Sequence, residues 1–296
     1  MQHLGIDYLD NLDFHGPGSY ETLKPALSDK GCLGYVRQLM SEGVVKNLGF
    51  STHGYAKGVM ELVNTNEFDS INLHYYYFYQ GLQDVVDRAA ELDMGVFIIS
   101  PNNQGGRLQM PTEALSQACQ PLASMAFNQM WLLNNPKVHT LSFGPANPDQ
   151  IEANLIAQDY DGTGAERAVF DSALQRVTER YHQSLGDAFC TTCNLCLPCP
   201  ENINIPGLLN WRQMNKAFDM YDFTKALYEK VGNGGARILC RKGNECTDRG
   251  ECEPRCPENL NNPNLLKLTH QELETGITSG PSWDHEGDLQ KEDLRS

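Results

Sequence analysis

The chain has no long apolar segment and no surplus of basic residues. None of its hydrophobic runs approaches the roughly 18 residues of a membrane-spanning helix, and its first residues lack the basic and apolar regions of a signal peptide. Its 296 residues include 38 acidic and 23 basic side chains, a net charge of −15, which argues against a basic nucleic-acid-binding face. We therefore expect a cytoplasmic protein with no nucleic-acid partner and no membrane contact.

Cysteine is scarce before Cys190, because the preceding part of the chain contains only Cys32 and Cys119. These two are expected to be small buried side chains rather than ligands. The other eight cysteines lie between Cys190 and Cys256. In a reducing compartment such a cluster is typical of metal binding, not of disulfides, so the chain divides into a cysteine-poor and a cysteine-rich part.

Short β-like runs alternate with helical patterns over residues 1–165. Strands are expected at residues 6–15, 44–51, 68–78, 95–100 and 138–144. Helices are expected at residues 32–43, 55–65, 80–93 and 113–134, and near 148, where Asn147 can cap one. This alternation predicts an α/β fold with a parallel sheet. No Gly-x-Gly-x-x-Gly segment follows a strand, so a Rossmann cofactor site is not supported.

A doubly wound sheet and a (β/α)8 TIM barrel both fit this alternation, and the barrel is preferred. A complete barrel has eight strands in about 250 residues, whereas only five strands are expected here. We therefore expect residues 1–165 to form an incomplete barrel, its last five units, with the other strands upstream. An open sheet exposes two edges, so a partner or a dimer is expected to cover them.

The remainder of the chain is expected to form a helical unit and a tail. Residues 166–270 read as helical between the cysteine groups. Residues 271–296 form an acidic tail that we expect to be disordered, because they hold seven acidic and two basic side chains.

Two segments carry the motifs of the cysteine-rich part. Residues 190–200 read CTTCNLCLPCP, and residues 246–257 read CTDRGECEPRCP. Their tails repeat, because residues 199–206 and 256–263 match at six of eight positions. Cysteines at this spacing, with proline after the last one, are typical of ferredoxins, in which each half supplies a ligand to the other half's cluster. We therefore expect a helical, two-cluster ferredoxin-like domain.

This arrangement distributes the thiolates over two clusters. A [4Fe–4S] cluster is expected on four of them: Cys190, Cys193, Cys196 and Cys256. The second cluster is expected on three: Cys199, Cys246 and Cys252. The position of its fourth ligand is occupied by Arg249, which cannot ligate iron. Cys240 is a candidate for that fourth ligand. The other interpretations are that the site holds a three-iron cluster or that it is empty. Zinc, which also takes four thiolates, is the alternative to iron.

Several segments of the first part resemble the aldo/keto reductase family. Residues 5–16 are similar to its fourth strand, residues 45–53 to its fifth, residues 104–108 to the loop after its seventh, and residues 144–155 to the loop and helix after its eighth. With the cysteine motifs added, the chain resembles the ferredoxin-fused branch of that family over roughly residues 4–263, without the N-terminal barrel strands.

The resemblance implies reduction of a small-molecule carbonyl by NADP(H), with a tyrosine as proton donor and Asp, Lys and His beside it. His15 matches the family's catalytic histidine, at the end of a strand where barrel enzymes place their chemistry. The family's other three residues come from earlier strands. Eight cofactor-binding positions carry over: Ser51, Asn72, Gly105, Gly106, Arg107, Gly144, Gln150 and Asn154.

The fusion implies an oxidoreductase coupled to iron–sulfur electron transfer, with a redox protein as a possible second partner. The alternative is an iron–sulfur protein without catalysis that transfers electrons or senses redox state, and a zinc-binding scaffold is the third hypothesis.

His53 and His74 are assigned no role. The aromatic run at residues 75–79 is expected to pack between the barrel and its helices.

Overall fold

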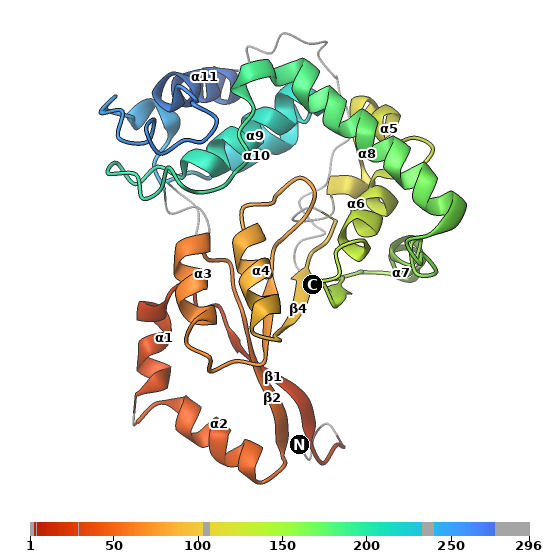
Figure 1. Cartoon of the computed structure of the whole chain (residues 1–296), viewed down its shortest axis with the longest axis vertical. Helices are drawn as coiled ribbons and strands as arrows, with labels where there is room; N and C mark the ends of the chain where they lie inside the picture. Colours follow the sequence, from red (N-terminus) through yellow and green to blue (C-terminus); the bar gives the residue numbers. More distant parts are fainter. Residues whose placement is uncertain (1–2, 4, 29, 103–106, 233–239, 276–296) are drawn as a thin grey trace.

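A five-stranded parallel sheet forms the first part of the computed structural model, which describes residues 3, 5–28, 30–102, 107–232 and 240–275 (Figure 1). The strands pair in chain order: β1 (Leu9–His15), β2 (Val45–Ser51), β3 (Ser70–Leu73), β4 (Gly95–Ile99) and β5 (Thr140–Ser142). This sequential order is that of a (β/α)8 barrel segment, because the strand order of a doubly wound sheet reverses at a switch point. The predicted α/β fold with five parallel strands is confirmed.

Helices connect and cover the strands of this part. Their bounds are α1 (Tyr20–Leu27), α2 (Cys32–Ser41), α3 (Ala56–Val63), α4 (Gln83–Glu91), the 3₁₀ turn η2 (Arg107–Gln109), α5 (Glu113–Cys119), α6 (Ser124–Leu133) and α7 (Pro148–Asn154). Helix α2 packs on β2 and α4 packs on β4, with α3 beside α4. Between these helices and the sheet lies an apolar core that includes Phe50, Ile71 and Val96, all fully buried.

Strand β3 is shorter than the sequence predicts. It ends at Leu73, and the aromatic run after it turns back on itself, because Tyr76 and Tyr79 exchange two backbone hydrogen bonds of 3.0 and 2.9 Å. The alternation of Tyr and Phe in this run resembles that of a strand, but the run has no neighbouring strand to pair with at this position. Its side chains pack inside the protein, as expected, and Tyr75, Tyr76 and Phe78 are almost fully buried.

The helix predicted at residues 113–134 is two helices, α5 and α6, separated at Pro121. Proline has no N–H to donate and disfavours helical backbone in the residue before it, so α5 ends at Cys119. Helix α1 was not expected; the hydroxyl of Thr22 in its first turn accepts a hydrogen bond of 3.1 Å from the N–H of Ser19. Asn147 caps α7 as predicted, with its Oδ1 accepting from the N–H of Gln150 at 3.0 Å.

The helical part lies beyond the carboxyl ends of the strands, at the top of Figure 1. It consists of α8 (Gly164–Leu185), η3 (Gly186–Ala188), α9 (Ile205–Phe218), α10 (Tyr221–Glu229), η4 (Gly243–Glu245) and α11 (Asn262–Thr275). Helix α11 therefore includes residues 271–275, which were expected in the acidic tail. The rest of that predicted tail, residues 276–296, lies outside the described residues.

A shared apolar core joins the two parts of the chain. The rings of Phe127 on α6 and Phe170 on α8 stack with centroids 5.8 Å apart, and Tyr181 on α8 packs edge-on against Phe218 on α9 at 4.8 Å. The predicted boundary after residue 165 falls at the first turn of α8. Helices on both sides of that boundary thus pack together.

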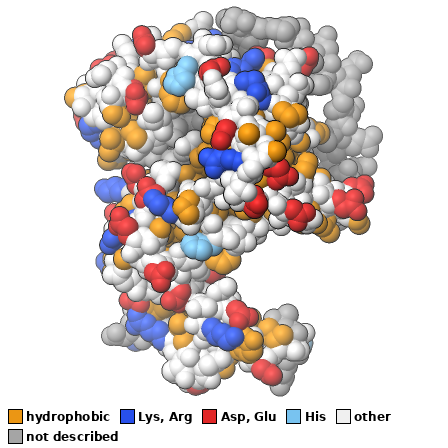
Figure 2. Space-filling view, turned by 45° about the vertical axis from the view of Figure 1, so that its right-hand side comes forward, with side chains coloured by type: hydrophobic (Ala, Val, Ile, Leu, Met, Phe, Trp, Pro, Cys, Tyr) orange, Lys and Arg blue, Asp and Glu red, His pale blue; other side chains and the backbone are white. Residues whose placement is uncertain are grey.

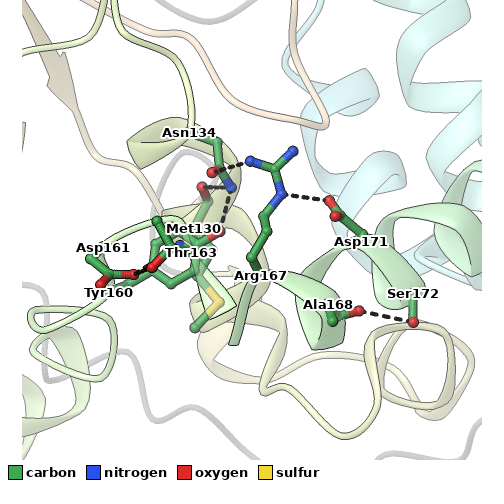
Figure 3. Close-up of polar contacts among 9 residues, drawn as sticks. All are labelled: Met130, Asn134, Tyr160, Asp161, Thr163, Arg167, Ala168, Asp171 and Ser172. Atoms are coloured by element: carbon green, nitrogen blue, oxygen red, sulfur yellow. Dashed lines mark hydrogen bonds and ion pairs between the residues drawn. The ribbon is translucent and has the colours of Figure 1, made fainter. Parts of the chain in front are cut away.

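Polar contacts hold the start of α8 against the end of α6 (Figure 3). The Nη1 of Arg167 donates to Asn134 Oδ1 at 3.0 Å, and its Nε donates to Asp171 Oδ1 at 2.8 Å. Asn134 in turn donates to the hydroxyl of Tyr160 at 2.7 Å. These bonds fix the direction in which α8 leaves the first part of the chain.

The surface carries charges of both signs. On the face shown in Figure 2, the Lys and Arg side chains of the described residues stand apart, with acidic side chains among them. Among the residues that the structure describes, no helix is both long enough and apolar enough to cross a membrane. Cys119 is fully buried as expected, but the same expectation for Cys32 is wrong: Cys32 is the first residue of α2 and is exposed, whereas Leu33 and Val36 further along the helix are buried.

Candidate functional site

Three of the predicted site residues form a row across the carboxyl ends of β1, β2 and β3. His15 pairs in register with Ser51, and Ser51 pairs with Asn72. Residues opposite one another on paired strands point to the same face of the sheet, so their side chains are neighbours. The Nδ1 of His15 and the hydroxyl of Ser51 are hydrogen-bonded at 3.1 Å.

Asn72 leaves an acceptor unused in this row. Its Oδ1 is buried and has no hydrogen-bond partner among the described residues. A buried amide oxygen without a partner costs roughly 1–3 kcal/mol, so such an atom is a candidate to accept a hydrogen bond from a ligand. The carboxamide of a nicotinamide ring carries an N–H group of the kind that fits it.

A second polar row lies two residues earlier on the same strands. Asp13, Gly49 and Ser70 are in register, and a Cβ at Gly49 would lie 2.2 Å from Asp13 Oδ1 and 2.3 Å from the Ser70 hydroxyl. Only glycine allows both side chains to approach β2 this closely. Burial raises the pKa of the Asp13 carboxyl, so the inside of the sheet below His15 is partly desolvated.

A chain of hydrogen bonds runs along the ends of β2, β3 and β4. His53 Nδ1 and His74 Nε2 are 2.7 Å apart, His74 Nδ1 bonds the hydroxyl of Tyr76, and that hydroxyl donates to the carbonyl of Ile99 at 2.7 Å. Since the Tyr76 proton goes to Ile99, His74 Nδ1 is the donor to Tyr76, and His74 Nε2 accepts from His53. His53 and His74 were assigned no role from the sequence; their positions just after two parallel strands are the signal that could have indicated them.

The remaining predicted cofactor residues lie around α7 and η2. Asn154 is buried, its Oδ1 accepts from Asn102 Nδ2 at 2.5 Å, and its Nδ2 donates to the Gln150 carbonyl at 2.7 Å. The Gln150 side chain accepts from the N–H of Ala146 at 2.7 Å. The Gln150 side chain therefore holds the loop before α7, and the Asn154 side chain links α7 to the segment after β4.

Arg107 and Gly144 stand at the edges of this region. The guanidinium of Arg107 lies over the ring of Phe223 on α10, 5.0 Å from its centroid, and Gly144 is exposed with open space where a Cβ would point. The predicted glycine turn at Gly105 and Gly106 lies outside the described residues.

The first four predicted cluster ligands come together in the structure. Burial raises the pKa of the Cys190 thiol to about 12, and the neighbouring thiols of Cys193 and Cys256 add to this shift. Burial likewise raises the pKa of Cys196 to about 12, and the thiols of Cys190, Cys193 and Cys252 act in the same direction. Cys256, from the second cysteine segment, therefore lies near Cys190 in the first.

The other three predicted ligands form a second group. Cys199, Cys246 and Cys252 line one cavity together with Arg249. Burial raises the pKa of Cys252, and the thiols of Cys199 and Cys246 raise it further. Each group thus combines thiols from both cysteine loops.

Cys240 lies apart from both groups. It is buried, the backbone of Asn204 is hydrogen-bonded to its thiol, and its charge would act on Tyr55 and Tyr228. It does not line the cavity that contains Arg249. The structure therefore does not bring this candidate ligand to the second thiol group.

The described residues hold no group of three or more His, Cys, Asp or Glu side chains close enough to bind one metal ion. The thiolates of an iron–sulfur cluster each bind a different iron atom, so they stand further apart than the ligands of a single ion. The donor set of the first group, four thiols and no carboxylate, fits a [4Fe–4S] cluster. The second group supplies three thiols and does not fit a four-iron cluster held by four cysteines.

The sequence repeat around the cysteines is also a structural repeat. Helices α9 and α11 each contain 14 residues, follow the two repeated tails and pack against each other. Asn204 Oδ1 accepts from the N–H of Gly207 at 3.2 Å, and Asn261 Oδ1 accepts from the N–H of Asn264 at 3.0 Å. The two halves therefore share a loop, a cap and a helix in the same order.

Aldo-keto reductases are among the solved structures to which this chain is similar. The holo form of one from Bacillus halodurans is 19% identical, with a TM-score of 0.47 over 58% of this chain and 61% of that protein. One from Klebsiella pneumoniae, in complex with NADP and acetate, is 18% identical, with a TM-score of 0.43 over 57% of this chain and 60% of that protein. No known family profile and no curated protein matches this chain.

This chain thus spans about 61% of the length of the first of these enzymes. Similarities at this level assign neither a family nor an activity to the chain. The parallel sheet, its strand order and the row of residues at its carboxyl edge rest on the contacts described above.

Proposed function

We propose that this chain is the C-terminal part of an aldo/keto reductase-type oxidoreductase, with NADP(H) as its hydride cofactor, joined to an iron–sulfur electron-transfer unit. The observation that carries the proposal is the division of seven thiols into two groups at the carboxyl end of a parallel sheet. Asn194, in the first cysteine loop, donates to the carbonyl of Gly81 in the segment after β3, at 2.6 Å. This hydrogen bond ties the first cysteine loop to the chain segment beyond the carboxyl end of β3.

The residues at the strand ends support the oxidoreductase part of the proposal. His15, fixed by Ser51, would orient a polar group of the substrate, and Asn72 Oδ1 would accept a hydrogen bond from the nicotinamide carboxamide. NADP(H) supplies a hydride when bound, and iron–sulfur clusters pass single electrons. A small-molecule carbonyl is the substrate class that the family resemblance suggests.

The alternative function is iron–sulfur electron transfer or redox sensing without carbonyl chemistry. It is favoured by the second group of thiols and its cavity, which electron transfer uses and carbonyl reduction does not need. In that case the row of His15, Ser51 and Asn72 would bind the dinucleotide without turning over a carbonyl.

The iron–sulfur part is tested on the whole chain purified without oxygen. We expect iron and acid-labile sulfide in equal or nearly equal amounts, and loss of about four iron atoms per chain in Cys190→Ser. Cys32→Ser is the matched control, because Cys32 is exposed on α2, and its iron content should equal that of the wild type. Protein that binds zinc and no sulfide would contradict the proposal.

The cofactor part is tested by titrating the same protein with NADPH and following its fluorescence. Asn72→Ala removes a single hydrogen bond worth about 0.5–1.5 kcal/mol, so the Kd should rise roughly 2- to 10-fold. Asn47→Ala, on the exposed part of β2, should leave the Kd unchanged. Equal affinities of the Asn72 variant and the wild type would contradict the assigned contact. Oxidation of NADPH by an added aldehyde would favour the reductase over its alternative.

A further inference from the structure

The two cysteine loops follow the same backbone path at their start, so residues 190–197 correspond one by one to residues 246–253. Two pairs of residues at equivalent places lie in the left-handed region of backbone space: Thr192 (φ 54°) with Asp248 (φ 55°), and Asn194 (φ 63°) with Gly250 (φ 69°). The turn that closes each loop is also the same. Leu197 N–H donates to the Asn194 carbonyl at 3.0 Å, and Glu253 N–H donates to the Gly250 carbonyl at 3.0 Å.

This equivalence pairs Arg249 with Cys193. Cys193 lies in the first thiol group, where its charge would act on both Cys190 and Cys196. Arg249 occupies the matching position beside Cys246 and Cys252 and lines the same cavity as they do. The position that would present a fourth thiolate to the second group therefore presents a guanidinium.

Arg249 cannot act as the missing ligand. A guanidinium is fully protonated in proteins and has no lone pair to give to iron. Its Nη2 lies 3.5 Å from Glu201 Oε1, and the hydroxyl of Thr247 donates to the same carboxylate oxygen at 2.8 Å. The carboxylate thus holds the arginine at the rim of the cavity.

No other described cysteine stands in for the missing thiolate. Cys240 does not line the cavity, and the four thiols of the first group are the proposed ligands of the other cluster. The second site therefore offers three thiolates: Cys199, Cys246 and Cys252. Three thiolates with one open corner are the ligand set of a cuboidal three-iron cluster, which is a four-iron cube without one iron.

We propose that the second thiol group of this chain holds a [3Fe–4S] cluster, with Arg249 over the corner that a fourth iron would fill. The proposal rests on the proposed function, since it requires that the thiols bind iron–sulfur clusters. The two clusters of the chain then differ in composition. The positive charge of Arg249 lies against an anionic cluster, where it favours the reduced, more negative form.

The test uses the whole chain, purified and kept without oxygen. We expect about seven iron atoms per chain, together with the low-temperature EPR signal of an oxidised three-iron cluster. Incubation with ferrous iron and a thiol reductant rebuilds a four-iron cluster at an accessible open corner, where water can complete the coordination of the fourth iron, but in this proposal Arg249 covers that corner. Here it should leave the three-iron signal unchanged, and conversion to a four-iron spectrum would overturn the proposal.

Three variants distinguish the ligand from its surroundings. Arg249→Cys should raise the iron content to about eight per chain and replace the three-iron signal with that of a second four-iron cluster. Arg249→Lys, which keeps the charge and adds no thiol, should keep the three-iron signal. Cys240→Ser should leave both clusters intact, and loss of iron in this variant would overturn the assignment.

The two proposals fail in different ways. Two results for the wild-type protein would overturn this inference and leave the proposed function standing. One is about eight iron atoms per chain with no three-iron signal, and the other is about four iron atoms per chain. Protein without any iron or sulfide would overturn both.

Discussion

Single side chains at the carboxyl ends of the strands are placed by register. Because β1, β2 and β3 pair in parallel without offset, residues far apart in the sequence, such as His15, Ser51 and Asn72, become neighbours. One layer below, Gly49 lets Asp13 and Ser70 meet across β2. The chemistry of this edge therefore depends on a residue that has no side chain.

Gly49→Ala should destabilise the protein by about 1–3 kcal/mol, because the new methyl group has no space between Asp13 and Ser70. Chemical denaturation of the whole chain measures this loss. Gly34→Ala is the matched control: Gly34 lies inside α2 with open space beside it, so alanine should stabilise that helix by about 0.5–1 kcal/mol. Equal effects of the two substitutions would contradict the close approach across β2.

At the level of elements, the two repeated helices are joined by a buried ion pair. Arg212 on α9 lies 3.0 Å from Glu272 on α11, both side chains are almost fully buried, and Lys216 contributes a second contact at 3.1 Å. Buried charges of this kind are costly when one partner is lost. The pair therefore fixes how the two halves of the cysteine-rich part face each other.

Glu272→Gln should lower the free energy of unfolding by about 3–5 kcal/mol, because it leaves Arg212 buried without its counter-charge. Glu274→Gln, on the same helix but in an exposed pair with Lys242, should cost at most about 1 kcal/mol. Thermal unfolding of the two variants gives the comparison. A similar small loss in both would show that the α9–α11 contact does not depend on the buried pair.

Elements that depend on local patterns were predicted well, and those that depend on tertiary neighbours were not. Strands β1, β2 and β4 match the apolar runs bounded by glycine or polar residues, and Asn147 caps α7 as its position indicates. The aromatic run after β3 was assigned to the strand because its alternation is local, whereas its turn depends on the packing of Tyr76 and Tyr79.

In the candidate site too, features that depend on local sequence patterns could be predicted, and those that depend on tertiary neighbours could not. The two groups of thiols follow from cysteine spacing and an internal repeat, both visible in the sequence, and the structure places the thiols accordingly. The bond between His53 and His74 could not be derived, because it requires knowing which strands are adjacent. The remoteness of Cys240 was hidden for a similar reason: its sequence distance from Cys246 is short, but its neighbours in space are Tyr55 and Tyr228.

On the scale of the whole molecule, one core connects the sheet to the cysteine-rich helices. Tyr77, in the segment after β3, is bonded to Thr178 on α8 at 3.0 Å, and its ring lies beside that of Tyr181. Asn210 on α9 reaches the carbonyl of Phe78 at 2.9 Å. The two parts should therefore unfold together.

Alkaline titration tests this shared core. Burial raises the pKa of Tyr77 and of Tyr79 to about 12, above the value of 10.0 for a free tyrosine. The unfolded chain loses these protons first, so the stabilisation is fully present below pH 10 and is lost as the pH rises from 10 towards 12. The part of the tyrosinate absorbance that comes from these buried residues should rise together with the loss of circular dichroism. Ionisation of all tyrosines near pH 10 without unfolding would contradict the packing.

The exchange of ligands between the two cysteine loops is the central claim, and Mössbauer spectroscopy of anaerobic whole-chain variants tests it most directly. Cys256 belongs to the second cysteine segment in the sequence, residues 246–257, but lies near Cys190 of the first segment in the structure. Cys256→Ser should therefore lose the same spectral component as Cys190→Ser, the four-iron cluster, while Cys199→Ser should lose the other. The account would be contradicted if Cys256→Ser lost the component that Cys246→Ser loses, since each loop would then bind its own cluster.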